Sequence, residues 1–122
     1  MDEKGAANFR DLIVWQRAHK LVLEIYSFTK GFPAEENYGL KSQMRRSAVS
    51  VAANIAEGFK KRGRADKIRY FNIAEGSLEE CRYYLVLSQD LQYGPTEKIA
   101  DVAEEVSKLL YAYSHAIQSR KF

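Results

Sequence analysis

Apolar residues recur every three or four positions along most of the chain, and this spacing predicts α-helices. The predicted helices cover residues 11–29, 38–58, 65–91 and 97–118. Short connections that contain glycine or proline separate them, and no stretch alternates with period two. Helices of this length with short connections predict one all-α domain over residues 1–122, an up-down-up-down antiparallel four-helix bundle.

The predicted first helix is apolar on more than one side. One face carries Leu12, Trp15, Ala18, Val22, Ile25 and Phe28. Much of the remaining circumference is covered by Ile13, Val14, Leu21, Leu23 and Tyr26. A helix in a four-helix monomer buries one inward stripe, so the second set needs another burial partner. We therefore expect an oligomer.

The predicted second helix combines an apolar stripe with a polar one. The apolar stripe is Leu40, Met44, Ala48, Val51 and Ile55, and beside it run Gln43, Ser47, Ser50, Asn54 and Glu57. Small hydroxyl and amide side chains beside a core stripe indicate a packed polar seam between helices. Asn37 is a candidate N-cap for this helix, and Gly58 is expected to end it.

The third and fourth predicted helices each carry one apolar stripe. That of the third is Ile68, Phe71, Ala74, Leu78, Cys81 and Leu85. That of the fourth is Ile99, Val102, Val106, Leu109, Tyr113 and Ala116. Cys81 is therefore interpreted as a small buried hydrophobic residue.

Charge is distributed unevenly along the chain, although the net charge is only +3. Residues 41–69 hold nine basic and two acidic residues, and residues 75–105 hold eight acidic and two basic ones. Either the two segments pair with each other, within a chain or between subunits, or the basic segment is an exposed surface that binds phosphate. Phe59 and Tyr70 flank the basic cluster, and aromatic rings near cations can stack on unpaired bases. The candidate nucleic-acid-binding residues are Arg45, Arg46, Lys60, Lys61, Arg62, Arg64, Lys67 and Arg69.

The residues offer little for catalysis. The residues three positions before His19 and His115 are Gln16 and Ala112, so the Glu-x-x-His pattern of di-metal bundle sites is missing. Glu75 and Glu79 share a helical face, and we favour ion pairs with Arg82, Arg45 or Arg46 over a general acid/base pair. The sequence therefore predicts a non-enzymatic protein without metal or cofactor. It shows no signal peptide or membrane span, which favours a cytoplasmic protein.

Four motifs occur in order: W-Q-x-A, Q-x-x-R-x-x-x-S, N-I-A-E-G and A-x-G-S-L-E-E. They lie in FRDLIVWQRAHKL (9–21), FPAEENYGLKSQMRRSAVSVAANIAEG (32–58) and FNIAEGSLEECRYYL (71–85). These segments resemble the four-helix bundle proteins encoded in intervening sequences of bacterial 23S ribosomal RNA genes. That family is also similar to the accessory variability protein of diversity-generating retroelements, a basic pentameric barrel that binds nucleic acid and a reverse transcriptase.

The resemblance implies a homopentamer with a role linked to RNA. The residues that correspond to the family signatures are Gln43, Arg46, Ser50, Asn54, Glu57 and Gly58, then Ala74, Gly76, Ser77, Leu78 and Glu80. We interpret them structurally: Gly76 and Ser77 let helices approach closely, and the polar stripe satisfies its hydrogen bonds across that contact. The predicted polar seam is Gln43, Ser50, Asn54, Glu57, Ser77 and Glu80.

Two functions remain open. The leading hypothesis is an oligomer that binds the sugar-phosphate backbone of RNA or DNA through a basic ring. The alternative is a protein-interaction scaffold whose basic segment docks an acidic neighbouring subunit or a separate partner, such as a nucleic-acid-processing enzyme. Charge reversal at Lys60, Lys61 and Arg62 discriminates between them.

Overall fold

The computed structural model describes residues 5–119, which form four α-helices. The helices are α1 (Ile13–Thr29), α2 (Leu40–Lys60), α3 (Arg64–Asp90) and α4 (Glu97–Gln118). Single 3-10 turns, η2 (Phe9–Asp11) and η3 (Ala34–Glu36), precede α1 and α2. These residues contain no strand, so the all-α prediction is confirmed, and each helix begins and ends within two residues of its predicted bounds.

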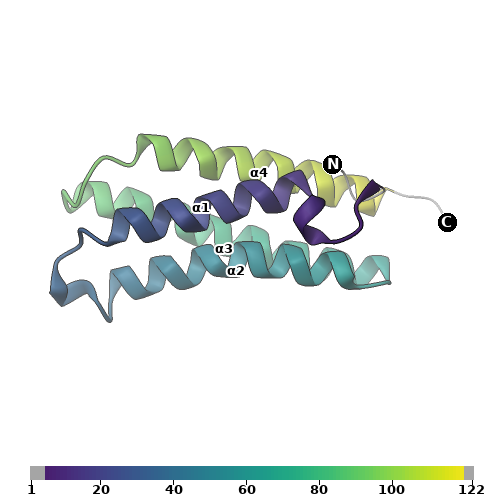
Figure 1. The fold of residues 1–122 in the computed structure, drawn as a ribbon, viewed down its shortest axis with the longest axis horizontal. Helices are drawn as coiled ribbons and strands as arrows, with labels where there is room; N and C mark the ends of the chain where they lie inside the picture. Colours follow the sequence, from purple (N-terminus) through teal and green to yellow (C-terminus); the bar gives the residue numbers. More distant parts are fainter. Residues whose placement is uncertain (1–4, 120–122) are drawn as a thin grey trace.

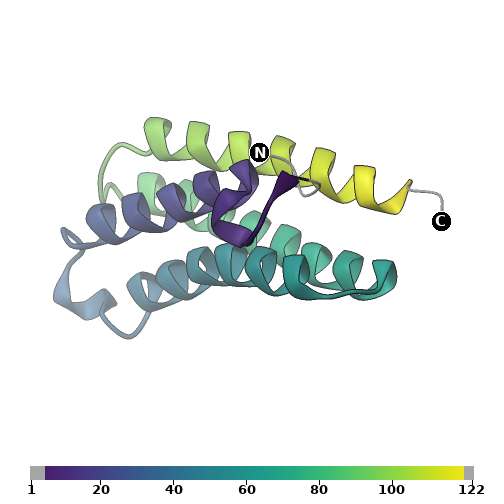
Figure 2. The same cartoon turned by 45° about the vertical axis from the view of Figure 1, so that its right-hand side comes forward.

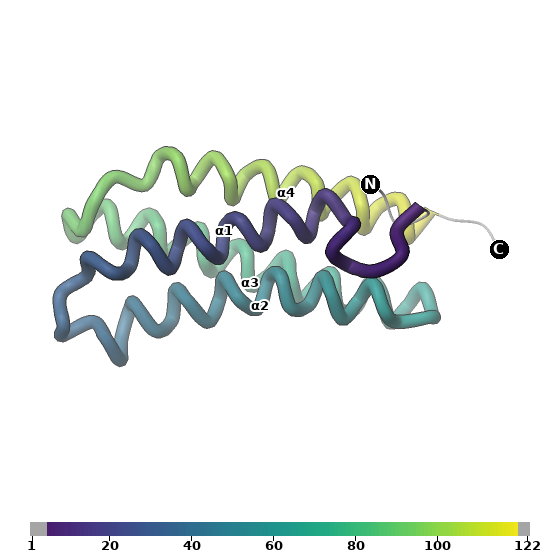
Figure 3. Tube along the Cα trace, in the orientation of Figure 1, coloured from purple at the N-terminus to yellow at the C-terminus, as the bar shows by residue number. Residues whose placement is uncertain are grey.

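Each helix packs against two others. α2 contacts α1 and α3, and α4 contacts the same two helices from the opposite side of the bundle (Figure 1). The α1–α2 and α3–α4 connections lie at one end of the molecule, and the short α2–α3 connection lies at the opposite end (Figures 1 and 3). The turned view shows the same arrangement (Figure 2). None of the helices within residues 5–119 is long and apolar enough to cross a membrane.

The core lies where the predicted stripes of α2 and α3 face each other. All five apolar residues predicted for the second helix are buried: Leu40, Met44, Ala48, Val51 and Ile55. On α3 the buried apolar residues are Phe71, Ala74, Leu78, Cys81 and Leu85. The interpretation of Cys81 as a buried hydrophobic residue is confirmed, since none of its surface is exposed.

The buried faces of α1 and α4 differ from the predicted ones. The core side of α1 is formed by Val14, Ala18, Leu21 and Ile25, with Leu12 directly before the helix, whereas Trp15, Val22 and Phe28 are only half-buried. On α4 the C-terminal half buries Leu110, Ser114 and Ile117, and leaves Leu109 and Tyr113 half-buried and Ala116 exposed. Because α1 is apolar on several sides, periodicity alone did not decide which side faces the core.

Gly58 does not end α2, which corrects the prediction. It is buried inside the last turn, and the helix continues to Lys60. A Cβ atom on Gly58 would lie 2.5 Å from Cε1 of Phe71 and 3.1 Å from Cβ of Tyr70. Glycine is needed here because α2 and α3 approach closely, directly before the α2–α3 connection.

The N-terminal end of α2 is capped by Glu36 rather than by Asn37. The Oε1 atom of Glu36 accepts a hydrogen bond of 3.1 Å from the backbone N–H of Leu40. Its Oε2 atom accepts a 2.7 Å hydrogen bond from the hydroxyl of Tyr93, in the α3–α4 connection. This bond raises the pKa of Tyr93. One carboxylate thus joins the two connections at this end of the bundle.

Candidate nucleic-acid interface

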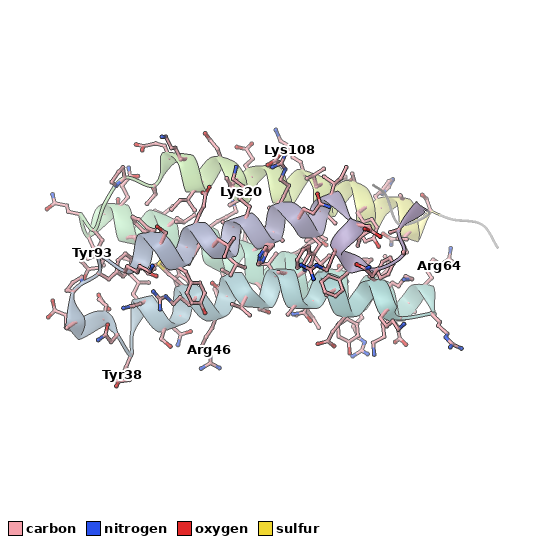
Figure 4. All side chains as sticks on the ribbon, viewed as in Figure 1. Lys20, Tyr38, Arg46, Arg64, Tyr93 and Lys108 are labelled. Atoms are coloured by element: carbon pink, nitrogen blue, oxygen red, sulfur yellow. The ribbon has the colours of Figure 1, made fainter. Side chains whose placement is uncertain are left out.

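The predicted binding residues fall into two groups at opposite ends of α2. Arg45 and Arg46 lie near its N-terminus. The other group, called here the basic end, is Lys60, Lys61, Arg62, Arg64, Lys67 and Arg69. Residues 46 and 60 are separated by about 21 Å along the helix axis at 1.5 Å per residue. Figure 4 shows Arg46 and Arg64 at well-separated points of the molecule. The structure therefore does not form one patch from all eight residues.

The basic end is built around a very short connection. α2 ends at Lys60, Lys61 adopts an extended conformation, and Gly63 is the N-cap of α3. Lys60 and Arg62 are exposed, and Lys61 is half-buried. Within residues 5–119, no carboxylate lies within 4.0 Å of the side-chain nitrogens of these three cations. Their positive charge is therefore available to an anionic partner.

Tyr70 lies among these cations. The ammonium of Lys61 is 5.0 Å from the centroid of its ring, and the guanidinium of Arg69 is 4.9 Å from it. Both distances are within the range of cation–π interactions. Arg69 also pairs with Asp66 at 3.6 Å across one helical turn. The predicted clustering of basic residues with Tyr70 is present in the structure.

The side chain of Lys67 caps the C-terminal end of α2. Its ammonium donates to the carbonyl oxygens of Phe59 at 2.7 Å and Gly58 at 3.3 Å, which belong to the last turn of α2. A cation at the C-terminus of a helix satisfies its open carbonyl groups and interacts favourably with the helix dipole. Arg64 donates to the carbonyl of Gln118 at 3.4 Å, which places the end of α4 beside the basic end.

Arg45 joins α2 to α1 and pairs with neither Glu75 nor Glu79. Its Nε donates to Oγ1 of Thr29 at 2.8 Å, and its Nη2 donates to the carbonyl of Tyr26 at 3.2 Å. The guanidinium also lies 4.4 Å above the Tyr26 ring. Arg46 is exposed.

Glu75 and Glu79, the acidic pair on α3, lie in different environments. Glu79 forms an ion pair with Arg82 at 3.6 Å, as predicted. Glu75 is half-buried and has no carboxylate–cation pair within the described part of the chain, and burial raises its pKa. The two side chains therefore differ in environment: Glu79 belongs to a solvated ion pair, and the carboxyl group of Glu75 is desolvated.

Three of the six residues predicted for the polar seam come together. The hydroxyls of Ser50 and Ser77 are 2.8 Å apart, across α2 and α3. The side-chain amide of Asn54 donates to the carbonyl and the hydroxyl of Ser50, at 2.8 and 3.0 Å. The other three, Gln43, Glu57 and Glu80, are exposed.

Gly76 also differs from the prediction. A Cβ atom there would meet nothing within 4 Å, so this glycine makes no close approach to another helix in residues 5–119.

The histidines and the cysteine were the remaining candidates for chemistry in residues 5–119. No three His, Cys, Asp or Glu side chains in this range could hold a metal ion. His19 stacks on Trp15 with ring centroids 5.0 Å apart, and His115 stacks on Tyr111 at 5.7 Å. Burial raises the pKa of the Cys81 thiol to about 11, so at neutral pH it is not a thiolate nucleophile.

Sequence reasoning missed a groove between α1 and α2. One stretch of it has a volume of about 270 Å³ and is lined by Phe9, Trp15, His19, Val22, Val49, Ala52, Ala53 and Ala56. The lining is almost entirely apolar, although it opens to solvent on the outer side of the two helices. The signal in the sequence was the excess of apolar residues on the first helix, together with alanines beside the core stripe of the second.

The comparisons with known proteins identify the family. The family model described as 23S rRNA-intervening sequence protein matches residues 10–112. The chain belongs to this family. The resemblance stated from the sequence motifs is thereby confirmed. Among curated proteins, none matches the chain.

A solved structure supports the same assignment. It is a crystal structure of a protein with unknown function from the S23 ribosomal protein family of Bacteroides thetaiotaomicron VPI-5482. It is 28% identical to this chain, with a TM-score of 0.75, and the match covers 84% of this chain and 98% of the other. The 23S rRNA-intervening sequence family match spans all candidate residues of the basic end and the polar seam, and it extends into α4 beyond the motifs seen in the sequence.

Proposed function

We propose that this 23S rRNA-intervening sequence family protein is a non-enzymatic, homo-oligomeric, up-down-up-down four-helix bundle that binds the backbone of RNA or DNA through its basic end. The observation that carries the proposal is the set of three neighbouring cations, Lys60, Lys61 and Arg62, without a carboxylate partner in residues 5–119. Clustered uncompensated cations attract phosphates and release counterions when they bind them.

Tyr70 favours single-stranded segments within this proposal. The side chain is half-buried and lies within cation–π distance of both Lys61 and Arg69. An unpaired base can exchange with one of these cations and stack on the ring, while the cations shift to the adjacent phosphates. Duplex ends and loops then bind better than continuous duplex.

The assembly is proposed to be a homopentamer, on the basis of the family resemblance, and exposed apolar side chains support self-association. On α1 the exposed fraction is 46% for Ile13 and 57% for Leu23, and on α3 it is 60% for Tyr83 and 57% for Val86. A protein-interaction scaffold is the second candidate function, and the apolar groove between α1 and α2 favours it. Such a scaffold holds an acidic neighbouring subunit or a nucleic-acid-processing enzyme.

Salt-dependent binding tests the first proposal. The fluorescence anisotropy of labelled single-stranded and duplex RNA is measured with the purified native oligomer from about 50 to 300 mM salt. We expect log affinity to fall linearly with log salt, by about 0.7 per contacted phosphate for a single strand. Binding that is undetectable at the lowest salt would refute the proposal, because electrostatic attraction is least screened there.

A matched pair of variants locates the interface. The triple substitution Lys60→Gln, Lys61→Gln and Arg62→Gln is expected to lower the slope by about 2 for each engaged subunit. The control replaces three exposed lysines elsewhere by glutamine, Lys20, Lys30 and Lys98, and so removes the same charge. Equal losses from both variants would show that net charge, rather than the basic end, carries the binding. Loss of assembly by the first variant alone would favour the scaffold.

A further inference from the structure

A second cationic site lies at the other end of α2, in the groove between α1 and α2. The cavity has a volume of about 570 Å³ and is lined mainly by Tyr26 of α1, and by Lys41, Ser42, Arg45, Arg46 and Val49 of α2. This volume is within the range of about 300–1,000 Å³ typical of small-ligand sites. The site is separate from the basic end and does not depend on it.

The lining residues of α2 share one face because of their spacing. Lys41 and Arg45 are four residues apart, as are Ser42 and Arg46, and Val49 follows Arg45 by four. Like charges at this spacing destabilise a helix slightly. Three positive side chains are thus held on one wall of the cavity, and no acidic residue lines it.

The charges on this wall lack compensation. Within residues 5–119, no ion pair involves Lys41, Arg45 or Arg46. In the part of the chain that the structure describes, the Lys41 ammonium donates only to the neutral amide oxygen of Asn37, at 3.3 Å. A local charge of about +3 without carboxylates is complementary to a phosphate dianion.

Arg45 gives the site a fixed element. Its bonds to Thr29 and Tyr26 use two of its five N–H donors, and they hold the guanidinium over the Tyr26 ring. The Thr29 hydroxyl in turn donates to the carbonyl of Ile25 at 2.8 Å. The remaining N–H donors of Arg45 are therefore presented from a preorganised group, which reduces the entropy lost on binding.

Apart from the cations, the wall combines the partly exposed Tyr26 and Val49 with the polar side chains of Asn37, Ser42 and Ser50. Tyr26 is 38% exposed and Val49 is 42% exposed, which leaves surface for a flat ring beside the cations. The hydroxyl of Ser42 adds a hydrogen-bonding group between Lys41 and Arg46. Charge, hydroxyl and apolar surface together fit a phosphate that is joined to a ring of nucleotide size.

We propose that this cavity binds a nucleoside monophosphate, either free or as the 5′-phosphorylated terminal nucleotide of an RNA strand. Lys41, Arg45 and Arg46 hold the terminal phosphate, and the ring rests against Val49 and Tyr26. A terminal phosphate is distinguished from an internal one because it carries up to two charges rather than one.

Titration of the full-length protein with adenosine monophosphate tests this inference by isothermal calorimetry. We expect saturable binding, weakened about tenfold or more by the double substitution Lys41→Gln and Arg46→Gln, as fits the loss of charge-assisted contacts. The control, Lys20→Gln with Lys98→Gln, removes the same charge from exposed lysines outside both proposed sites and leaves binding unchanged. Absence of saturable binding at millimolar nucleotide, or equal weakening by both variants, would overturn the inference. So would binding of inorganic phosphate as tight as that of the nucleotide.

Two further titrations identify the source of the phosphate. A short RNA with a 5′-phosphate is compared with the same RNA carrying a 5′-hydroxyl, each in competition with adenosine monophosphate. Stronger displacement by the phosphorylated strand assigns the site to RNA ends, and displacement by neither assigns it to the free nucleotide. The two proposals fail separately. If the protein binds the nucleotide but the basic end binds no RNA, the proposed function is refuted and this inference stands.

Discussion

Replacement of Gly58 by alanine tests the close approach of α2 and α3 beneath the basic end. The new Cβ would lie 2.5 Å from Cε1 and 3.0 Å from Cδ1 of Phe71, a ring with no exposed surface. Phe71 also packs against Tyr113, with ring centroids 4.9 Å apart, so the ring has little room to move away. The helices must therefore separate or the ring must leave its preferred rotamer.

Two opposing effects determine how much the Gly58→Ala substitution lowers the free energy of unfolding. Overpacking a close-packed core costs about 1–3 kcal/mol, and this clash belongs in the upper part of that range. Replacing glycine by alanine within a helix returns about 1 kcal/mol. The net loss in the free energy of unfolding is therefore about 1–2 kcal/mol, which corresponds to a decrease in Tm of about 4–8 °C for a domain of this size.

The assay is urea unfolding followed by circular dichroism, at one fixed protein concentration because the proposed assembly would stabilise the folded state. Gly76→Ala is the matched control, since its Cβ would meet nothing within 4 Å, and we expect it to stabilise the protein by up to about 1 kcal/mol. Combining Gly58→Ala with Phe71→Leu should lose less stability than the sum of the single variants. A Gly58→Ala protein as stable as the wild type, or strict additivity in the double variant, would refute this account.

Three other substitutions or modifications have predictable effects. Burial raises the folded-state pKa of Glu75, so the protonated form favours folding, and this stability is lost as the pH rises through that pKa. Glu75→Gln should therefore raise Tm at pH 7, and the gain should vanish below the ordinary carboxyl pKa of about 4.3. Glu79→Gln, at the residue paired with Arg82, should change Tm little. A gain from Glu75→Gln that persists at acid pH would contradict this reasoning. Lys67→Met removes two hydrogen bonds to the end of α2 and should cost about 1–2 kcal/mol in urea unfolding; an unchanged midpoint would mean that water replaces them. Cys81 should react with iodoacetamide at pH 8 only after unfolding, because it is buried and its pKa is about 11, and rapid labelling of the native protein would argue against the packing described.

The helices were predictable because their apolar spacing is regular and their connections contain glycine or proline. The side of α1 that faces the core was not, since Val14 and Trp15 are both apolar and the sequence gives no reason to bury one more than the other. Gly58 posed a similar ambiguity, because glycine occurs both after helix ends and at close helix contacts. Only the position of Phe71 on the neighbouring helix distinguishes these roles.

The presence of a basic segment could be predicted from the sequence, but the separation of its residues into two groups at opposite ends of α2 could not. Nine basic residues in one segment indicated a phosphate-binding surface, but proximity in sequence does not mean proximity in space along a helix. The length of α2 separates Arg46 from Lys60. The side chain of Arg45 also reaches Thr29 and Tyr26 on another helix, a contact that no local pattern reveals.

The contact between Arg64 and the last turn of α4 has a practical consequence for protein engineering. Both ends of the described chain lie near the α2–α3 connection, because Ala7 and Phe9 line a pocket together with Lys60, and Arg64 contacts Gln118. A polyhistidine or acidic tag joined directly to either of these segments changes the electrostatic field at the basic end. The opposite end, where Glu36 and Tyr93 join the two connections, offers an attachment point remote from those cations. A dye placed there is clear of the basic end, but Asn37, next to Glu36, lines the proposed nucleotide cavity, so such a dye suits assays of the basic end alone.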